Sequence, residues 1–172
     1  RIWVGCYGGG LNLIEETQEG NIRFLHSGNK LTGYSKDRFA KVRYITEANQ
    51  VLLVGTTEGL LTFSSEFTQP EQIEFYRNIR IPDKVSSLCS NDVIYIYTDS
   101  RKDTYVLSFT GGLNKILSEN LLSNEIEFKT YTTQNGLPSD LVESMIEDNK
   151  GNLWIIAENA LACFHPDKET FE

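Results

Sequence analysis

The chain has few of the residues that build catalytic and metal sites. Its only histidines, His26 and His165, lie beside loop-forming residues, and neither has an acidic or cysteine ligand at a recurring spacing. We expect both to be solvated loop residues, with a catalytic base or metal ligand as the alternative. No G-x-S-x-G, H-E-x-x-H, Walker or Rossmann pattern occurs. The sequence therefore predicts no catalytic residue, no cofactor and no metal.

Cysteine is also scarce. Cys6, Cys89 and Cys163 fall at unrelated places, with no close pair and no metal-type spacing. We expect small, buried apolar side chains, with a disulfide or metal site as the alternative. An odd count does not identify the redox compartment.

Long apolar runs and excess positive charge are missing as well. No stretch approaches the roughly 18 apolar residues of a membrane span. Acidic residues outnumber basic ones by 24 to 16, a formal net charge of −8. This balance argues against nucleic acid or an anionic membrane as a partner of this segment. Arg1 begins the chain in the middle of a repeat unit, so we expect a piece of a longer protein.

One short phrase occurs four times in the sequence. It reads small residue, leucine, two variable residues, then isoleucine or phenylalanine. The copies are residues 10–14, 59–63, 112–116 and 160–164. They begin 49, 53 and 48 residues apart (59−10, 112−59, 160−112). A period near 50 made of short segments is typical of a repeat architecture.

The rest of the unit repeats too, as β-branched and aromatic segments bounded by turn residues. We expect the first strand of the unit at 42–47, 85–90 and 142–147, and the second strand at 2–5, 52–55, 94–97 and 153–156. The repeated phrase is expected to form the third strand. The fourth strand is expected at 22–24, 73–75 and 126–128. Four strands per unit predict the blade of a β-propeller, with an accidental resemblance of a β-sandwich as the alternative. The expected all-β fold is a partial propeller of about four four-stranded antiparallel blades: 1–28 (no first strand), 39–77, 85–131 and 141–172 (short fourth strand).

Three local features favour structural roles. Trp3, Tyr95 and Trp154 are expected at one point of the second strand, where Leu53 stands in the second unit, so packing between blades is favoured over sugar stacking. Residues 8–10 lead into a strand and predict a flexible turn rather than a phosphate loop. Residues 148–152 predict a tight hairpin turn rather than half a calcium loop.

An ordered motif over residues 134–166 carries a family resemblance. It runs Asn135-Gly-Leu-Pro-Ser-Asp140, Val142-x-Ser-Met-x-Glu-Asp148, Lys150-Gly-Asn-Leu-Trp-Ile155, Ala160-Leu and Phe164-x-Pro166. This closely resembles the two-component regulator propeller repeat, and the resemblance extends over essentially the whole chain. It weakens in the third unit, where Tyr97 replaces the usual glycine and residues 98–110 form an expected insertion. In the fourth unit, Ile156 and Ala160 stand in place of glycine.

The resemblance implies a function. Such repeats build the periplasmic sensor regions of hybrid two-component histidine kinases, inner-membrane proteins of glycan-degrading gut bacteria. These sensors usually carry two propellers of about seven blades, followed by a β-sandwich, a membrane helix and a kinase. The resemblance implies a segment that is not an enzyme, detects an oligosaccharide and signals to transcription of polysaccharide-utilisation genes. A protein-interaction scaffold and a lyase-type propeller enzyme are the alternatives.

The candidate ligand residues come from loops expected at one end of the blades. Mixed charges with tyrosine suit a sugar, because they combine hydrogen-bonding groups with a stacking face. Segment 99–110 is the best local candidate, because long loops on a rigid scaffold often carry function. An ordinary solvated rim is the alternative for each residue. The candidates are Tyr7, Tyr34, Arg38, Arg80, Asp99, Arg101, Asp103 and Asn159.

An open stack of blades also predicts partners. It leaves an apolar face at each end and unpaired strand edges. We expect these surfaces to meet the remaining blades of a parent protein or a second copy in a homodimer.

Overall fold

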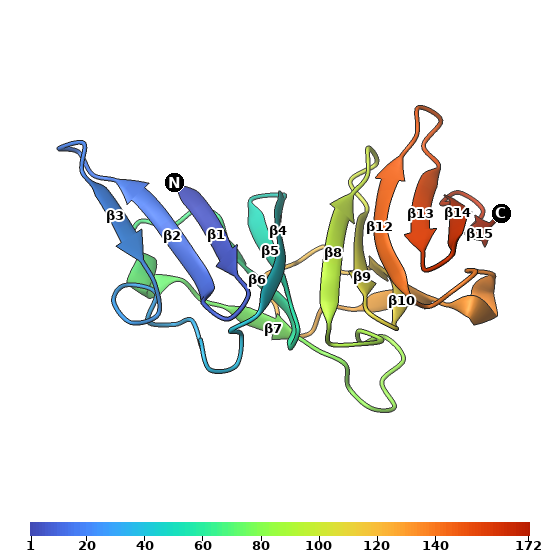
Figure 1. Ribbon diagram of the computed structural model, residues 1–172, viewed down its shortest axis with the longest axis horizontal. Helices are drawn as coiled ribbons and strands as arrows, with labels where there is room; N and C mark the ends of the chain where they lie inside the picture. The colour runs from blue at the N-terminus through green and yellow to red at the C-terminus, as the bar shows by residue number, and fades with distance from the viewer.

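The computed structural model describes all 172 residues. The chain folds into four antiparallel sheets, each a meander of consecutive strands, and Figure 1 shows them following one another from the N-terminus to the C-terminus. Two short 3-10 turns, Pro70–Gln72 and Thr133–Asn135, are the helical elements. No helix is long and apolar enough to cross a membrane. This architecture confirms the predicted all-β propeller fragment.

We call the sheets blades one to four and their strands A to D in chain order; blade one begins at strand B. The strands of blade one are β1 (Ile2–Cys6), β2 (Gly10–Glu16) and β3 (Ile22–Leu25). Those of blade two are β4 (Val42–Ala48), β5 (Val51–Thr56), β6 (Gly59–Ser64) and β7 (Tyr76–Asn78). Those of blade three are β8 (Val93–Thr98), β9 (Thr104–Ser108), β10 (Gly112–Ile116) and β11 (Phe128–Tyr131). Those of blade four are β12 (Val142–Glu147), β13 (Leu153–Ala157), β14 (Ala160–His165) and β15 (Thr170–Phe171).

The small residue that opens the repeated phrase has a steric cause. Gly10, Gly59 and Gly112 begin their C strands at φ of 72°, 122° and 62°, where a side chain is strained. A Cβ on Gly112 would also lie 2.4 Å from the Tyr131 carbonyl oxygen of strand D. The repeated phrase therefore begins where the chain leaves the B–C hairpin and enters strand C, close to the backbone of strand D.

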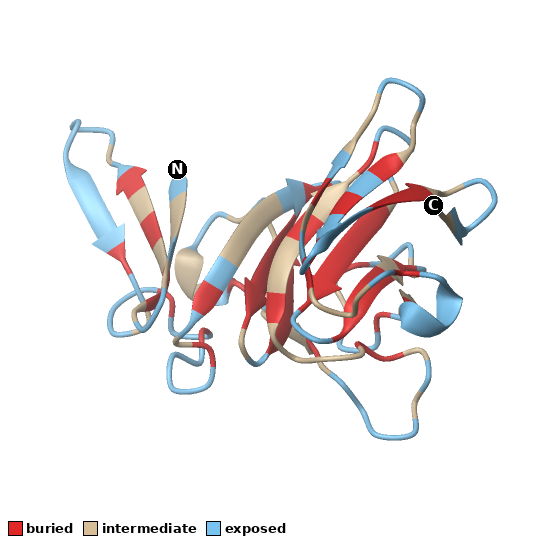
Figure 2. Ribbon diagram, turned by 45° about the vertical axis from the view of Figure 1, so that its right-hand side comes forward, coloured by how far each residue is buried: buried red, intermediate tan, exposed pale blue.

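The core consists of three layers, each lying between two adjacent blades. Every layer holds 12 buried hydrophobic residues. Successive residues of one strand point to opposite faces of the blade and so belong to different layers. In β5, Val54 faces blade one and Leu53 faces blade three. Trp3 packs edge-on against Phe63 at 4.9 Å between ring centres, so it lies between blades one and two. Figure 2 shows the buried residues concentrated on the interior strands, while β3 is almost wholly exposed.

Strand A carries the same irregularity in each of its three copies. The pairing of strands A and B slips by one residue at Arg43, Ile94 and Glu143, each one residue after the strand begins. A β-bulge leaves the extra residue unpaired and increases the local twist. Its recurrence at one position indicates that the blades are structural copies.

Blade three departs from the sequence-based expectation by one strand. Residues 85–90, expected as strand A, form bends and turns, and 94–97, expected as strand B, belong to strand A. The expected insertion 98–110 contains strand B itself, β9. The counterpart of Trp3 and Trp154 is therefore Tyr105 rather than Tyr95. Strands A and B share an aliphatic and aromatic composition, so composition alone did not distinguish them. The D strands of blades two and three also begin later than expected, at Tyr76 and Phe128.

Both end faces of the stack are apolar and uncovered. On blade four, Trp154, Ile156 and Leu161 are 36%, 46% and 62% exposed. The residues at the same register in blade three, which are Tyr105, Leu107 and Leu113, are fully buried by blade four. On blade one, Ile2 and Phe24 are 61% and 65% exposed. The two end faces therefore expose the same kind of apolar side chains that are buried between adjacent blades.

Candidate functional site

The connections between strands gather at two opposite ends of the blades. The B–C hairpins and the D–A connections between blades lie along one end, at the lower edge of Figure 1, which we call the loop face. The A–B hairpins and C–D connections lie at the other end, the opposite face. The D–A connections of the loop face are residues 26–41, 79–92 and 132–141.

Four of the predicted site residues lie exposed on the loop face. They are Tyr7, Arg38, Arg80 and Asn159. Tyr34 lies in the same D–A connection as Arg38 but is only 4% exposed, and its hydroxyl donates to the Phe39 carbonyl oxygen. Burial raises the pKa of Tyr34 to about 12. Tyr34 therefore holds its loop in place and is not accessible to a ligand.

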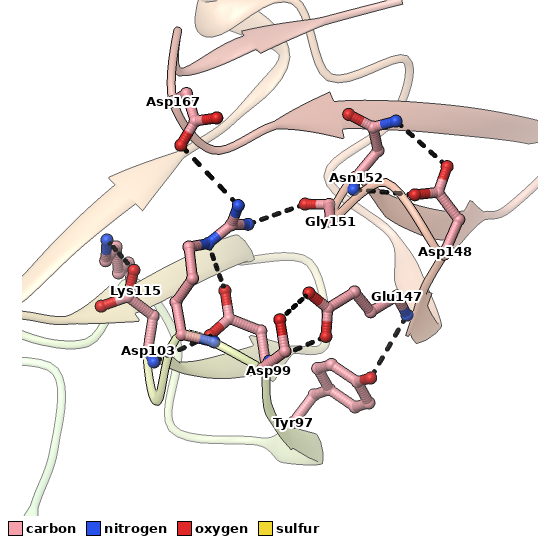
Figure 3. A network of polar contacts seen from close by, with 11 residues as sticks. Tyr97, Asp99, Asp103, Lys115, Glu147, Asp148, Gly151, Asn152 and Asp167 are labelled. Atoms are coloured by element: carbon pink, nitrogen blue, oxygen red, sulfur yellow. Dashed lines mark hydrogen bonds and ion pairs between the residues drawn. The ribbon is translucent and has the colours of Figure 1, made fainter.

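The other three predicted residues, Asp99, Arg101 and Asp103, lie on the opposite face. They belong to the A–B hairpin between β8 and β9, and not to a B–C loop as expected. Figure 3 shows Asp99 and Asp103 in a polar network that extends to residues of blade four. The error follows directly from the shifted strand assignment in blade three.

The hairpins of blades three and four are the same five-residue turn. The Asp99 carboxylate accepts the backbone N–H of Arg101 at 3.0 Å and of Asp103 at 2.9 Å. Asp148 accepts the N–H of Lys150 at 2.8 Å and of Asn152 at 3.0 Å. Bonds from the Trp154 indole, the Asn152 side chain and these amides hold the pKa of Asp148 far below its usual range. The sequence signal was Asp followed four residues later by Asp or Asn.

The two turns also interlock across the blade boundary. Arg101 Nη2 donates to the Gly151 carbonyl oxygen at 2.7 Å, and the Ser100 N–H and hydroxyl donate to the Glu147 carboxylate at 2.7 and 2.6 Å (Figure 3). Asp103 accepts a bond from Lys115 at 2.6 Å. The contacts of Ser100 and Arg101 therefore join blades three and four, whereas Asp103 pairs within blade three.

An aromatic and cationic cluster lies on the loop face. Tyr7 is 63% exposed and forms an isolated β-bridge with Lys41. The Lys41 ammonium and the Arg43 guanidinium lie 5.5 and 5.4 Å from the centre of its ring. Arg43 binds both carboxylate oxygens of Asp92, at 2.5 and 2.8 Å, and this partner raises the pKa of the guanidinium. The cluster therefore combines an exposed aromatic ring with Lys41, which makes no ion pair, whereas the Arg43 guanidinium is already bound to Asp92.

Sequence reasoning found Tyr7 but missed Lys41 and Arg43. Arg43 is the bulged residue of β4, so its position on the loop face depends on a pairing irregularity. A bulge leaves no clear composition signal, whereas Lys41 could have been found as the residue just before strand A.

The two histidines do not converge. His26 lies in the first D–A connection, where its Nδ1 accepts the Gly28 N–H at 3.1 Å. His165 lies on blade four at the opposite face, 2.8 Å from the Asn152 side-chain oxygen. No group of three histidine, cysteine or acidic side chains is arranged to hold a metal ion.

One segment of blade four matches a known protein family. Residues 136–159 match the family model of the two component regulator propeller, over the interlocking turn of blade four and strands β12 and β13. The predicted resemblance is confirmed. No curated protein is significantly similar in sequence.

Solved structures extend the likeness from this segment to the fold of nearly the whole chain. The extracellular domain of the putative hybrid two component system BT4673 from B. thetaiotaomicron matches with a TM-score of 0.69 at 19% identity, over 99% of this chain and 23% of that one. The corresponding domain of BT3049 from the same organism matches with a TM-score of 0.62 at 18% identity, over 99% and 26%. PorZ, a surface component of the type-IX secretion system of Porphyromonas gingivalis, matches with a TM-score of 0.66 at 16% identity, over 94% and 23%.

These likenesses establish a shared propeller fold. The chain spans about a quarter of the length of each solved structure.

Proposed function

We propose that this chain is an extracytoplasmic ligand-sensing segment of a hybrid two-component sensor, and that it binds an oligosaccharide on the loop face. The supporting observation is where the exposed apolar side chains lie. Seven lie on the end faces and have the chemistry of blade packing: Ile2, Ile22, Phe24, Ile146, Trp154, Ile156 and Leu161. Of the five large exposed hydrophobic residues elsewhere, four lie on the loop face: Tyr7, Ile81, Val85 and Phe109.

A rigid sheet scaffold with functional loops at one end suits binding rather than catalysis. The loop face carries Tyr7 beside Lys41 and the Arg43–Asp92 ion pair, and its remaining exposed residues are mixed in charge. In the parent protein, the occupied sensor would stand in the periplasm and pass its signal through an inner-membrane histidine kinase to transcription of polysaccharide-utilisation genes. The kinase activity would belong to a part outside this chain.

A protein-interaction scaffold is the second candidate. The same exposed side chains favour it, because apolar residues at loop tips also mark protein contacts. A lyase-type enzyme has less support, since it needs a histidine and acidic cluster on one face and the two histidines lie far apart in the fold.

Thermal unfolding against a panel of plant, host and microbial oligosaccharides tests the proposal. A ligand at about 100 times its Kd adds about 2.7 kcal/mol of stability. For a chain of this size that corresponds to a rise in Tm of roughly 5–10 °C. We expect a selective rise with one glycan family, and we expect Tyr7→Ala to reduce it.

Lys102→Gln on the opposite face serves as the control and should leave the rise unchanged. If no glycan shifts the Tm of this chain, the oligosaccharide site is not on these blades, and partner capture through the loop face would then favour the scaffold.

A further inference from the structure

The D–A connection between blades two and three, residues 79–92, forms a pocket on the loop face. Its volume is about 310 Å³, at the small end of the ~300–1,000 Å³ typical of ligand pockets. Buried Leu88 forms part of its wall, and Ile81 and Val85 line it while remaining 43% and 93% exposed. A largely apolar pocket with a few polar groups at its rim is the usual form of a small-molecule site.

The segment that forms the pocket is held in place before any ligand arrives. The buried Ser87 hydroxyl accepts the Ile81 N–H at 2.9 Å and donates to the Lys84 carbonyl oxygen at 2.8 Å. The Arg80 N–H donates to the Asn91 side chain at 2.6 Å, and the Ser86 carbonyl accepts the Phe128 N–H at 2.8 Å. A loop fixed in this way loses little entropy on binding.

Two cations at this pocket have no charged partner. Arg80 and Lys84 both line it, and neither takes part in an ion pair or donates a side-chain hydrogen bond. Eight of the sixteen basic side chains, by contrast, are paired with carboxylates. In a chain of net charge −8, two free cations sharing one pocket favour an anionic ligand.

A pocket on the opposite face provides the contrast. It measures about 270 Å³ and contains Ile116, Leu117 and Leu121, but most of its lining residues are polar. Its single cation, Lys102, is accompanied by two carboxylates, those of Asp103 and Glu119. An anionic ligand of the same size is therefore expected to choose the Arg80–Lys84 pocket.

From these observations we infer that the Arg80–Lys84 pocket binds an acidic sugar unit, a pyranose carrying a carboxylate or sulfate. The apolar C–H face of the ring would pack on Ile81 and Val85. Arg80 presents a planar fork that matches either anion, and Lys84 adds a second charge. This inference rests on the proposed function, because it names the class of oligosaccharide that the loop face would detect.

Asp83 places a carboxylate in the same pocket as the two cations. It lines the pocket at φ of 64° and makes no ion pair with Arg80 or Lys84. Its carboxylate would repel an acidic ligand, so Asp83→Asn should strengthen binding. Asparagine tolerates this left-handed conformation, so the loop should keep its shape.

The test is calorimetric titration of the full chain with digalacturonate, a monosulfated galactobiose and neutral galactobiose. We expect at least one acidic disaccharide to bind about tenfold or more tightly than the neutral one, since losing a charge-assisted bond has roughly that effect. Comparing the two acids identifies the anion. Arg80→Gln and Lys84→Gln should each weaken binding about tenfold, Asp83→Asn should strengthen it, and Lys102→Gln should leave it unchanged.

Cys89 offers an independent readout of where the ligand lies. Cys89 lines the pocket and is a partly exposed residue, and Cys6 is similarly exposed but outside the pocket. A bound acidic sugar should slow alkylation of Cys89 and leave that of Cys6 unchanged.

The outcomes separate the two proposals. Neutral sugar binding as tightly as acidic sugar, or acidic binding unaffected by Arg80→Gln and Lys84→Gln, overturns the acidic-sugar pocket and leaves the proposed function standing. Inorganic sulfate protecting Cys89 as well as the sugars do would show an anion site without sugar recognition and also overturn the inference. A panel in which no saccharide of any kind binds overturns both.

Discussion

Replacing Tyr105 by phenylalanine should stabilise the protein. Tyr105 lies fully buried between blades three and four, and its hydroxyl has no hydrogen-bond partner. An unsatisfied buried hydroxyl costs about 1–3 kcal/mol relative to the unfolded chain, where water satisfies it. Tyr105→Phe keeps the ring, which packs edge-on against Phe164 at 6.3 Å, and removes only the polar atom.

The expected gain follows from two opposing contributions. Removing the hydroxyl recovers about 1–2 kcal/mol, and the small void left behind costs a few tenths of a kcal/mol at about 24 cal/mol per Å³. The net stabilisation is about 1 kcal/mol, equivalent to a rise in Tm of roughly 2–4 °C for a chain of this size. Urea unfolding at pH 7 should show a higher midpoint with an unchanged m-value.

Alkaline pH gives a second readout. Burial raises the pKa of Tyr105 above its ordinary value near 10. As the pH rises, the unfolded chain therefore loses the Tyr105 proton before the folded chain does. The free energy of unfolding of the wild type is unaffected by this tyrosine below pH ~10 and falls as the pH rises further. The gap between Tyr105→Phe and the wild type should widen above pH 10.

Tyr131→Phe is the matched control, because the Tyr131 hydroxyl donates to Glu169 at 2.8 Å in the same layer. This variant should lose about 1 kcal/mol. If Tyr105→Phe is also destabilising, or neutral, the reasoning is refuted: the hydroxyl would then have a partner, such as a buried water.

Three further predictions concern stability and can be checked by the same urea unfolding. Asp99→Ala should cost about 1–3 kcal/mol, because it removes the acceptor of two backbone amides, and should leave glycan binding unchanged; a specific loss of binding would contradict its structural role. Gly112→Ala should cost more than 1 kcal/mol, because its Cβ would meet the Tyr131 carbonyl, whereas Gly8→Ala has open space and should cost less; equal costs would show that backbone strain alone decides. Leu113→Ala should cost about 2–5 kcal/mol and its exposed counterpart Leu161→Ala under about 1; a similar cost for both would mean that the end face of blade four is already covered.

The sequence allowed the fold to be predicted because the repeat signals are local. Gly59 and Gly112 mark a backbone conformation that other residues avoid, and the leucine after each marks a core position. Blade three was misassigned because Ile94-Tyr-Ile-Tyr97 has the composition of either inner strand. Only pairing with β9, a non-local contact, identifies it as strand A.

The site was predicted less well, since burial decides it. Tyr7 and Tyr34 both lie in polar, glycine-containing loops, yet one is 63% exposed and the other 4%. What separates them is the packing of Tyr34 against Phe39 and Phe75, two residues brought to it by the fold. Arg80 was predicted, but Lys84, which lines the same pocket, was missed. The pocket forms only when residues 79–92 fold around the Ser87 hydroxyl, and the sequence does not reveal this contact.

The bulge at the start of each strand A has a consequence for how such a protein can evolve. The bulged position lies outside the ladder, so pairing places little demand on its side chain. It is occupied by an arginine, an isoleucine and a glutamate in the three copies, at Arg43, Ile94 and Glu143. Selection can therefore exchange cation, hydrocarbon and anion at one rim of the propeller, one blade at a time, without refolding any of them.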